Sequence, residues 1–340
     1  MRPRPLEEPP RLRWALLPTR IERLSRYSAA LPGVEVWIKR DDQSGFLLSG
    51  NKVRKLEYSL AAALAEGVDG VITCGGFNSN HCRAAALLAA RLGLECHLLL
   101  RTADGGPPRR LQGNTLLDRL AGARIRWITP EEYRHRTALM AEHRDREALA
   151  GRRLACIPEG ASDAIGSFGY VSAVVELQEQ LRAKNLRVEW VVHATGSGGT
   201  AAGLSAGRAR HDASWRLLTY TVCDDESYFR EKIGGIRADL EAYGLPRLSA
   251  EEGIEIVDRY KGRGYGLTTP AELRWIRDFC REEGILLDPC YTGKAFYGLH
   301  QEILAGRFAP GSRILFLHTG GGFGNFAYED EWGEALDELS

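Results

Sequence analysis

The fold is indicated most strongly by residues 190–200, which read Trp190-Val191-Val192-His193-Ala194-Thr195-Gly196-Ser197-Gly198-Gly199-Thr200. The first five residues form a nearly continuous apolar run, which is typical of a strand buried on both faces of a parallel sheet. A glycine-rich turn follows and leads into a helix that we expect to start near Ala201. Glycines let several backbone N–H groups turn inward together, and a helix N-terminus adds positive potential. The segment therefore indicates a phosphate-binding loop, to which Ser197 and Thr200 could add hydroxyl donors.

Two other interpretations of this loop stay open at this point. Residues 196–201 also fit the G-x-G-x-x-A pattern of dinucleotide-binding loops. Asp224 and Asp225 follow the next expected strand, as the acidic residue of a nicotinamide site would. A tight strand–helix turn without any ligand is the plainer alternative.

Outward from this segment, short apolar runs alternate with stretches of helical period in both directions. Strands are expected at residues 34–39, 70–74, 96–100, 124–128, 154–157, 190–194, 217–222 and 314–318. Helices are expected at residues 55–66, 82–92, 131–149 and 170–181. Apolar strands that alternate with helices predict parallel sheets covered on both faces. Because so many strand–helix units would crowd one open sheet, we expect two sheets.

The composition excludes several classes of protein. Among 340 residues, 45 Lys and Arg balance 45 Asp and Glu, which argues against a partner held by charge, such as nucleic acid or a membrane surface. No apolar run reaches the length of a membrane span, and residues 1–10 lack the apolar region of a signal peptide. The seven cysteines are scattered without C-x-x-C pairs, so neither a disulfide framework nor a zinc cluster is predicted. We expect a cytoplasmic protein.

Two further loops carry residues suited to chemistry. In Ser49-Gly50-Asn51-Lys52-Val53-Arg54-Lys55-Leu56-Glu57, a lysine stands among small polar residues just before an expected helix. Such a lysine is more often solvated, but a desolvated one could attack a carbonyl, and Lys55 could reach an anion from the same side. In Gly75-Gly76-Phe77-Asn78-Ser79-Asn80-His81, free N–H groups at a helix start could grip a carboxylate. Ser79 as a simple N-cap, and His81 as a structural histidine, are the alternatives.

Taken together, these loops resemble the pyridoxal-phosphate (PLP) enzymes of fold type II, and among them the D-cysteine desulfhydrase / 1-aminocyclopropane-1-carboxylate (ACC) deaminase family. The resemblance runs from about Leu17 to Phe323, and the order of its motifs disposes of most of the nicotinamide case. The matching segments are residues 38–42, 49–57, 78–83, 196–200, 223–225, 288–294 and 318–321.

The resemblance implies a tryptophan synthase β-like α/β fold of two three-layer α/β/α domains with mostly parallel sheets. Residues 1–52 and 166–340 would form a large PLP-binding domain and residues 53–165 a small α/β domain, with PLP in the cleft between them. Members of the family are commonly homodimers, so a homodimer is expected here too.

The resemblance also implies a role for each matching residue. Lys52 would hold PLP covalently and move the α-proton of a small amino-acid substrate. Asn80 would bind the PLP 3′-oxygen, and Lys55 would lie near the phosphate. The remaining cofactor-binding residues would be Gly196, Ser197, Gly198, Gly199, Thr200, Thr292 and Thr319. The substrate would contact Asn78, Ser79, Asn80, His81, Tyr265 and Tyr291, of which Ser79, Tyr265 and Tyr291 join Lys52 as catalytic candidates.

The reaction is predicted from what would face the pyridine nitrogen of PLP. The deaminase branch of the family has a glutamate after the tyrosine that matches Tyr291, whereas this sequence has Thr292, together with Thr319 in the late His-Thr-Gly-Gly motif. A neutral hydroxyl stabilises a protonated pyridine less than a carboxylate would. This favours β-elimination from D-cysteine, giving pyruvate, ammonia and hydrogen sulfide, over ACC ring opening. The preference for the D enantiomer rests on the resemblance alone.

The sequence departs from the family near the expected pocket. Phe77 stands where a smaller aliphatic is usual, Asn78 where Gln is common, and Cys290 where Val is common. Residues 161–163 read Ala-Ser-Asp in place of Gly-Ser-Asn. Alternatives to D-cysteine elimination are therefore ACC deamination, elimination or β-replacement on another β-substituted amino acid, and a catalytically degenerate PLP-binding protein.

Overall fold

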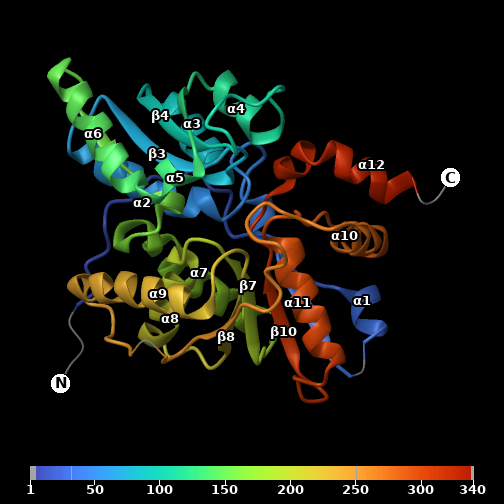
Figure 1. Ribbon diagram of the computed structural model, residues 1–340. Helices are drawn as coiled ribbons and strands as arrows, with labels where there is room; N and C mark the ends of the chain where they lie inside the picture. The colour runs from blue at the N-terminus through green and yellow to red at the C-terminus, as the bar shows by residue number, and fades with distance from the viewer. Residues whose placement is uncertain (1–4, 32, 250, 338–340) are drawn as a thin grey trace.

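A computed structural model describes residues 5–31, 33–249 and 251–337, which form two sheets with helices packed around them (Figure 1). The larger sheet has six strands in the order β1-β2-β10-β7-β8-β9. Its strands are β1 (Ile21–Arg23), β2 (Glu35–Lys39), β7 (Trp190–Thr195), β8 (Arg216–Thr221), β9 (Glu255–Val257) and β10 (Arg313–Leu317). β1 is antiparallel to β2, and every other neighbouring pair is parallel.

The smaller sheet is wholly parallel, in the order β5-β4-β3-β6. Its strands are β3 (Gly70–Gly76), β4 (Glu95–Arg101), β5 (Arg124–Ile128) and β6 (Leu154–Cys156). The chain thus passes from the larger sheet to the smaller one between residues 39 and 70, and it returns between residues 156 and 190. The exact domain boundaries, 52/53 and 165/166, stay a prediction.

The helices cover both faces of each sheet. They are α1 (Ser25–Ala29), α2 (Asn51–Ala65), α3 (Asn80–Leu92), α4 (Gly113–Leu120), α5 (Pro130–Arg134), α6 (Arg136–Leu149), α7 (Ala164–Ala183), α8 (Gly199–Arg210), α9 (Glu226–Leu240), α10 (Pro270–Glu283), α11 (Thr292–Leu304) and α12 (Glu329–Asp337). Short 3₁₀ turns are η1 (Asp41–Gln43), η2 (Glu159–Ala161), η3 (Glu241–Tyr243) and η4 (Gly322–Ala327). No helix in the described part of the chain is long and apolar enough to cross a membrane.

Alternating residues of β7 show why the large sheet is buried on both sides. Val191 belongs to a core with residues of α7, α8 and α9, whereas Trp190 and Val192 belong to a core with residues of α1, α10 and α11. In the small sheet, Val71 faces a core that includes α2 and α3, and Ile72 faces one that includes Met140 of α6. Both units are therefore three-layered, which confirms the predicted fold class.

The elements differ from the prediction mainly at short or interrupted segments. The helix expected from residue 55 begins at Asn51, which places Lys52 in its first turn. The helix expected at 131–149 is broken at His135, whose φ of −102° and ψ of 17° are not helical. β1 and β9 were not predicted, because three residues are too few for a visible period.

Candidate functional site

A glycine fixes where α2 begins and what lies beside Lys52. Gly50 has a φ of 103°, which strongly favours glycine, and a Cβ built on it would lie 2.7 Å from the carbonyl oxygen of Thr319. That carbonyl accepts the N–H of Asn51 at 3.0 Å. The loop before α2 can approach the segment after β10 this closely only because residue 50 has no side chain. Lys52 and Thr319 are thereby brought to one cavity.

The empty space at this cavity, open solvent at its mouth included, is about 390 Å³. It is lined by Asn51, Lys52, Asn80, Ala194, Thr195, Gly196, Ser197, Gly198, Thr200, Tyr291, Thr319 and Gly320. Residues from distant parts of the sequence, most of them predicted site residues, thus meet around Lys52. None of the described residues that line the cavity is an Asp or Glu.

The Lys52 amine is suited to act as a nucleophile or a base. Burial lowers its pKa to about 8, and the negative charge of Glu159 opposes that shift without cancelling it. A lysine with a pKa near 8 has a sizeable neutral fraction at neutral pH, and only the neutral amine can attack a carbonyl or accept a proton.

The glycine-rich turn after β7 packs directly against Lys55. A Cβ on Gly199 would lie 2.4 Å from Lys55 Nζ and 2.9 Å from the Cα atom of Ser162, so a side chain at this position would displace the amine and press on the backbone. Lys55 Nζ donates to Ser162 Oγ at 2.8 Å, and Ser162 Oγ donates to Ser197 Oγ at 2.8 Å. Burial, together with the positive charge of Lys52, holds the pKa of Lys55 well below its usual value.

These groups fit the phosphate of PLP. The turn supplies backbone N–H groups at the start of the twelve-residue helix α8, and Ser197 and Thr200 supply hydroxyls on the cavity wall. Lys55 is fully buried, and no carboxylate of the described residues hydrogen-bonds to it. A buried amine without a counter-ion is costly unless an anion joins it. The site therefore has both the shape and the charge for a phosphate.

The amide of Asn80 is held in one orientation by its neighbours. Asn80 Oδ1 accepts hydrogen bonds from Asn114 Nδ2 at 2.9 Å and from Arg83 Nη1 at 3.4 Å. Arg83 also donates to Asn114 Oδ1 at 3.0 Å. With its oxygen engaged, Asn80 keeps its NH₂ group as a donor at the cavity wall, which fits a phenolate oxygen of the cofactor.

The other predicted substrate residues of this loop already make hydrogen bonds within the protein. Asn78 donates to the Gly324 carbonyl at 3.1 Å and accepts the Asn114 N–H at 2.7 Å. Ser79 caps α3, because its Oγ accepts the N–H of Cys82. His81 contacts Thr73 Oγ1 through Nε2 at 2.8 Å. Burial and the two nearby lysines hold the pKa of His81 well below its usual value, so its ring is neutral. The roles of Asn78, Ser79 and His81 toward a substrate stay predictions.

Tyr265 and Tyr291 form a pair beside the cavity. Their hydroxyl oxygens lie 2.8 Å apart, and their rings meet edge to face. Tyr291 lines the Lys52 cavity, and both tyrosines line an adjoining hollow whose empty space, open solvent at its mouth included, is about 1060 Å³. A Cβ on Gly196 would lie 2.8 Å from the Tyr291 ring, and one on Gly76 would lie 2.9 Å from the Tyr265 ring. Gly76 at the end of β3 and Gly196 directly after β7 therefore make room for the two rings.

The two threonines expected to bind the cofactor lie differently. Thr292 is fully buried outside the cavity lining, and its hydroxyl donates to Asp288 Oδ1 at 2.7 Å and accepts the Asp288 N–H at 2.9 Å. Thr319 lines the cavity. Of the two hydroxyls, that of Thr319 is placed to meet a bound cofactor, whereas that of Thr292 holds the turn before α11.

Several residues that organise the site were not predicted. Asp288 accepts the N–H groups of Cys290, Tyr291 and Thr292 and so fixes the start of α11. It opens a motif that the sequence does display, but nothing in the sequence reveals that it binds backbone. Ser162 lies in segment 161–163, whose sequence differs from the usual one of the family, and Asn114 lies in no recognised motif.

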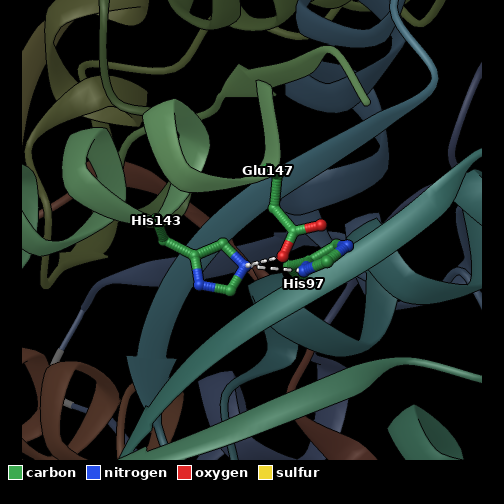
Figure 2. A group of neighbouring side chains, drawn as sticks. All are labelled: His97, His143 and Glu147. Carbon is green, nitrogen blue, oxygen red and sulfur yellow. Dashed lines mark hydrogen bonds and ion pairs between the residues drawn. The ribbon is translucent and has the colours of Figure 1, made fainter. Parts of the chain in front are cut away.

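A second cluster of polar side chains lies on the small sheet, where His97 of β4 meets His143 and Glu147 of α6 (Figure 2). His97 Nδ1 and His143 Nε2 are 2.8 Å apart, and Glu147 lies 3.9 Å from His143 Nε2. Arg146 donates to His143 Nδ1 at 2.6 Å, and His97 Nε2 contacts Glu95 at 3.1 Å. Every ring nitrogen thus has a partner in a chain of hydrogen bonds from Arg146 to Glu95. These hydrogen bonds explain why the two histidines lie together.

Comparisons with known proteins agree with this geometry. The family model described as "Pyridoxal-phosphate dependent enzyme" matches residues 14–320. The bifunctional D-cysteine desulfhydrase/ACC deaminase of Arabidopsis thaliana, named as mitochondrial, is 40% identical over 96% of this chain and 82% of its own. A putative ACC deaminase of Thermotoga maritima is 40% identical over 93% of this chain and 98% of its own.

Solved structures give the same result. An ACC deaminase homologue superposes with a TM-score of 0.88 at 36% identity, covering 96% of this chain and 97% of its own. A threonine deaminase from Solanum lycopersicum, at 16% identity and a TM-score of 0.63 over 94% of this chain and 83% of its own, shares the fold. The chain therefore belongs to the fold type II enzymes that depend on pyridoxal phosphate, in the family of D-cysteine desulfhydrase and ACC deaminase.

Proposed function

We propose that the protein catalyses β-elimination from D-cysteine, in which D-cysteine and water give pyruvate, ammonia and hydrogen sulfide. The observation that carries this proposal is the lining of the Lys52 cavity, where the described residues include the Thr319 hydroxyl but no carboxylate. A hydroxyl stabilises a protonated pyridine nitrogen less than a carboxylate does, so the cofactor is a weaker electron sink. Expulsion of a thiolate suffers less from this weakness than the opening of a cyclopropane ring.

Each residue of the site has a part in this reaction. PLP, when bound, supplies electron withdrawal from the α-carbon of an amino acid joined to it. The glycine-rich turn and Lys55 would hold its phosphate, the Asn80 amide would donate to its 3′-oxygen, and the Thr319 hydroxyl would be the partner of its ring nitrogen. The backbone amides around Ser79 bind the substrate carboxylate.

Lys52 moves the proton. With its low pKa, the neutral amine accepts the proton from Cα while the Cα–Cβ double bond forms and the Cβ–S electron pair leaves on sulfur. The Tyr265–Tyr291 pair, with hydroxyls 2.8 Å apart, would cover the reacting carbons and keep them away from bulk water. Water then releases ammonia and the keto acid.

ACC deamination is a second candidate, favoured by the names of the relatives. The Arabidopsis protein is named for both activities, and those of Thermotoga maritima and Pyrococcus abyssi are named putative ACC deaminases. In that reaction ACC and water give 2-oxobutanoate and ammonia. It requires an electron sink strong enough to open a ring without any leaving group at Cβ.

Product analysis separates the two candidates. The PLP-loaded protein is incubated separately with D-cysteine, L-cysteine and ACC, and the keto acid is identified by mass. Pyruvate with sulfide from D-cysteine, and no 2-oxobutanoate, is the expected result. 2-Oxobutanoate from ACC at a comparable rate would overturn the argument from Thr319. Pyruvate from L-cysteine alone would reverse the assigned stereochemistry.

We further propose that the enzyme is a cytoplasmic homodimer built from the two domains given above. The homodimer is supported by the family resemblance, the domains by the two separate sheets, and the cytoplasmic location by the scattered cysteines alone, since the Arabidopsis relative is named as mitochondrial. Light scattering of the purified protein, with twice the mass of one chain as the expected result, tests the dimer. Limited proteolysis near residues 52 and 165 tests the boundaries.

A further inference from the structure

Arg101 ends strand β4 at the same edge of the small sheet as the candidate substrate loop. In the parallel register Arg101 pairs with Gly76, directly before Phe77 and Asn78. It lines the hollow of about 1060 Å³ that it shares with Asn80 and Tyr291, both of which also line the Lys52 cavity. A group on a substrate bound beside Lys52 and reaching into this hollow would meet Arg101.

The guanidinium of Arg101 is held by aromatic rings. Its Cζ atom lies 4.8 Å from the ring centre of Tyr133 and 5.4 Å from that of Tyr265. Stacking against rings covers the faces of a guanidinium but leaves the N–H donors at its edge available. Tyr265 thus connects Arg101 to the tyrosine pair over the Lys52 cavity.

No carboxylate within residues 5–31, 33–249 and 251–337 hydrogen-bonds or ion-pairs with Arg101. The nearby Arg136, by contrast, lies 3.1 Å from Glu159. Glu331 lines the same hollow from α12 but is exposed to solvent. A half-buried guanidinium that is oriented by rings and lacks a counter-ion is typical of a binding site for an anion.

We propose that Arg101 determines specificity by binding an anionic group at Cβ of the substrate, so that the enzyme prefers α-amino acids with an ionised β-substituent. The inference rests on the proposed elimination and deepens it. In D-cysteine the group is the thiolate, which leaves with the electron pair of the Cβ–S bond while the α-proton passes to Lys52. ACC has no such group, and Arg101 therefore contributes nothing to its binding.

Binding of unreactive amino acids tests the proposal without turnover. Aspartate and asparagine have the same shape but differ by a charge at the position in question, and their dissociation constants follow from the change in absorbance of the bound cofactor. We expect the preferred enantiomer of aspartate to bind about tenfold more tightly than the matching asparagine, as a charge-assisted hydrogen bond predicts. Arg101→Met should remove this preference, and Arg101→Lys should restore part of it.

The ratio is taken within each protein, so a loss of overall stability does not change its meaning. Arg134→Met is the matched control, because Arg134 is a nearby exposed arginine that already pairs with Glu131 at 2.8 Å. It should keep the wild-type ratio. Equal ratios in the wild type and Arg101→Met would overturn the proposal.

Turnover separates a failure of this inference from a failure of the proposed function. The chlorine of β-chloro-D-alanine carries no charge until it leaves as chloride, so Arg101→Met should raise KM about tenfold for D-cysteine but leave KM for β-chloro-D-alanine unchanged. An equal rise for both substrates would contradict a role in charge recognition. If the wild type releases pyruvate from neither compound, the proposed elimination is wrong, and the aspartate-to-asparagine ratio alone decides whether Arg101 binds an anion.

Discussion

The two sides of helix α2 place buried cations in opposite surroundings. On one side, Arg54 donates to both oxygens of Asp41, at 2.8 and 2.9 Å, and to Glu176 at 2.8 Å. Lys52 and Lys55 differ from Arg54 in direction by about 200° and about 100°, and, being three positions apart, they lie within about 60° of each other. On their side, no carboxylate of the described residues hydrogen-bonds to either lysine.

The two sides of α2 therefore serve different purposes: one fixes the helix in the fold, and the other presents amines to the candidate site. The arginine side, defined as Arg54 with Asp41 and Glu176, is a satisfied network that also engages Lys39 and fixes α2 against β2 and α7. The lysine side, defined as Lys52 and Lys55, keeps two desolvated amines together at a cost in stability, which a bound anion can offset. Substitutions on the two sides should therefore affect different measurements.

The largest effect is expected from Lys52→Ala. This change removes both the amine that would hold the cofactor and the base that would take the α-proton, so kcat/KM should fall by about 10⁴-fold or more. The visible absorbance of covalently held PLP should disappear, while the free energy of unfolding changes little or rises. Activity that survives this change would exclude the proposed role of Lys52.

Arg54→Met should chiefly affect folding. It leaves Asp41, which is fully buried, without its main counter-ion, and removing one partner of a buried pair costs about 3–5 kcal/mol. Urea unfolding of the apoprotein measures the loss. Arg144→Met is the matched control, because Arg144 pairs with Asp145 at the surface, where the loss of an ion pair changes stability little. Equal losses in the two variants would show that the arginine side is not a structural network.

The pH dependence of that loss has a definite sign. Burial alone would raise the pKa of Asp41, but Arg54 and Lys39 overcome burial and lower it to about 2. A carboxyl with a lowered pKa stabilises the fold above its unfolded pKa of about 4, and this contribution is lost as the pH falls toward 2. Without Arg54, burial dominates and protonation relieves the buried charge. The difference between wild type and Arg54→Met should therefore shrink between about pH 5 and pH 2.

Lys55→Met should move stability and cofactor affinity in opposite directions. The pKa of Lys55 is held well below its usual value, so at neutral pH its burial destabilises the apoprotein, and the variant should unfold at a higher temperature. Affinity for PLP should fall by about 10- to 100-fold, because a charge-assisted contact to the phosphate is lost. Inorganic phosphate should stabilise the wild-type apoprotein more than the variant. A variant with weaker cofactor binding and a less stable apoprotein would show that Lys55, like Arg54, stabilises the fold, and would contradict the difference between the two sides of α2.

The lysine side was largely predictable from sequence, and the arginine side was not. The sequence predicts Lys52, Asn80 and the glycine turn because each stands in a short motif that resembles a motif of the PLP enzymes. Asp41 and Arg54 lie in those same motifs, yet nothing local shows that Glu176, more than a hundred residues away, completes their network. Buried ion networks depend on tertiary packing, which periodicity does not encode.

The same distinction explains Thr292. Sequence places it next to Tyr291, where the family has a residue facing the cofactor, but only the structure shows that Asp288 engages its hydroxyl. Adjacent residues at the start of a helix point in different directions, and the sequence does not reveal which of two neighbouring threonines faces a cavity.

The smallest effect is expected from removing the charge of Glu159, which raises the pKa of Lys52 against the lowering by burial. Glu159, which pairs with Arg136 at 3.1 Å, is the main negative charge that opposes the effect of burial on Lys52. Glu159→Gln removes that charge, so the pKa of Lys52 should fall further below its present value of about 8, by less than about one unit.

The rate of PLP capture by the apoprotein, followed by absorbance across pH 6–10, measures this shift, because only the neutral amine reacts. The midpoint of the rate profile should move to lower pH in Glu159→Gln, so that capture at pH 7 becomes faster although a polar contact has been lost. Glu131→Gln, at an exposed position on the neighbouring helix α5, should leave the midpoint unchanged. A midpoint that stays fixed in Glu159→Gln would mean that burial alone tunes the Lys52 amine and that the lysine side lacks even this distant counter-charge, whereas a midpoint that rises would contradict the sign of the effect.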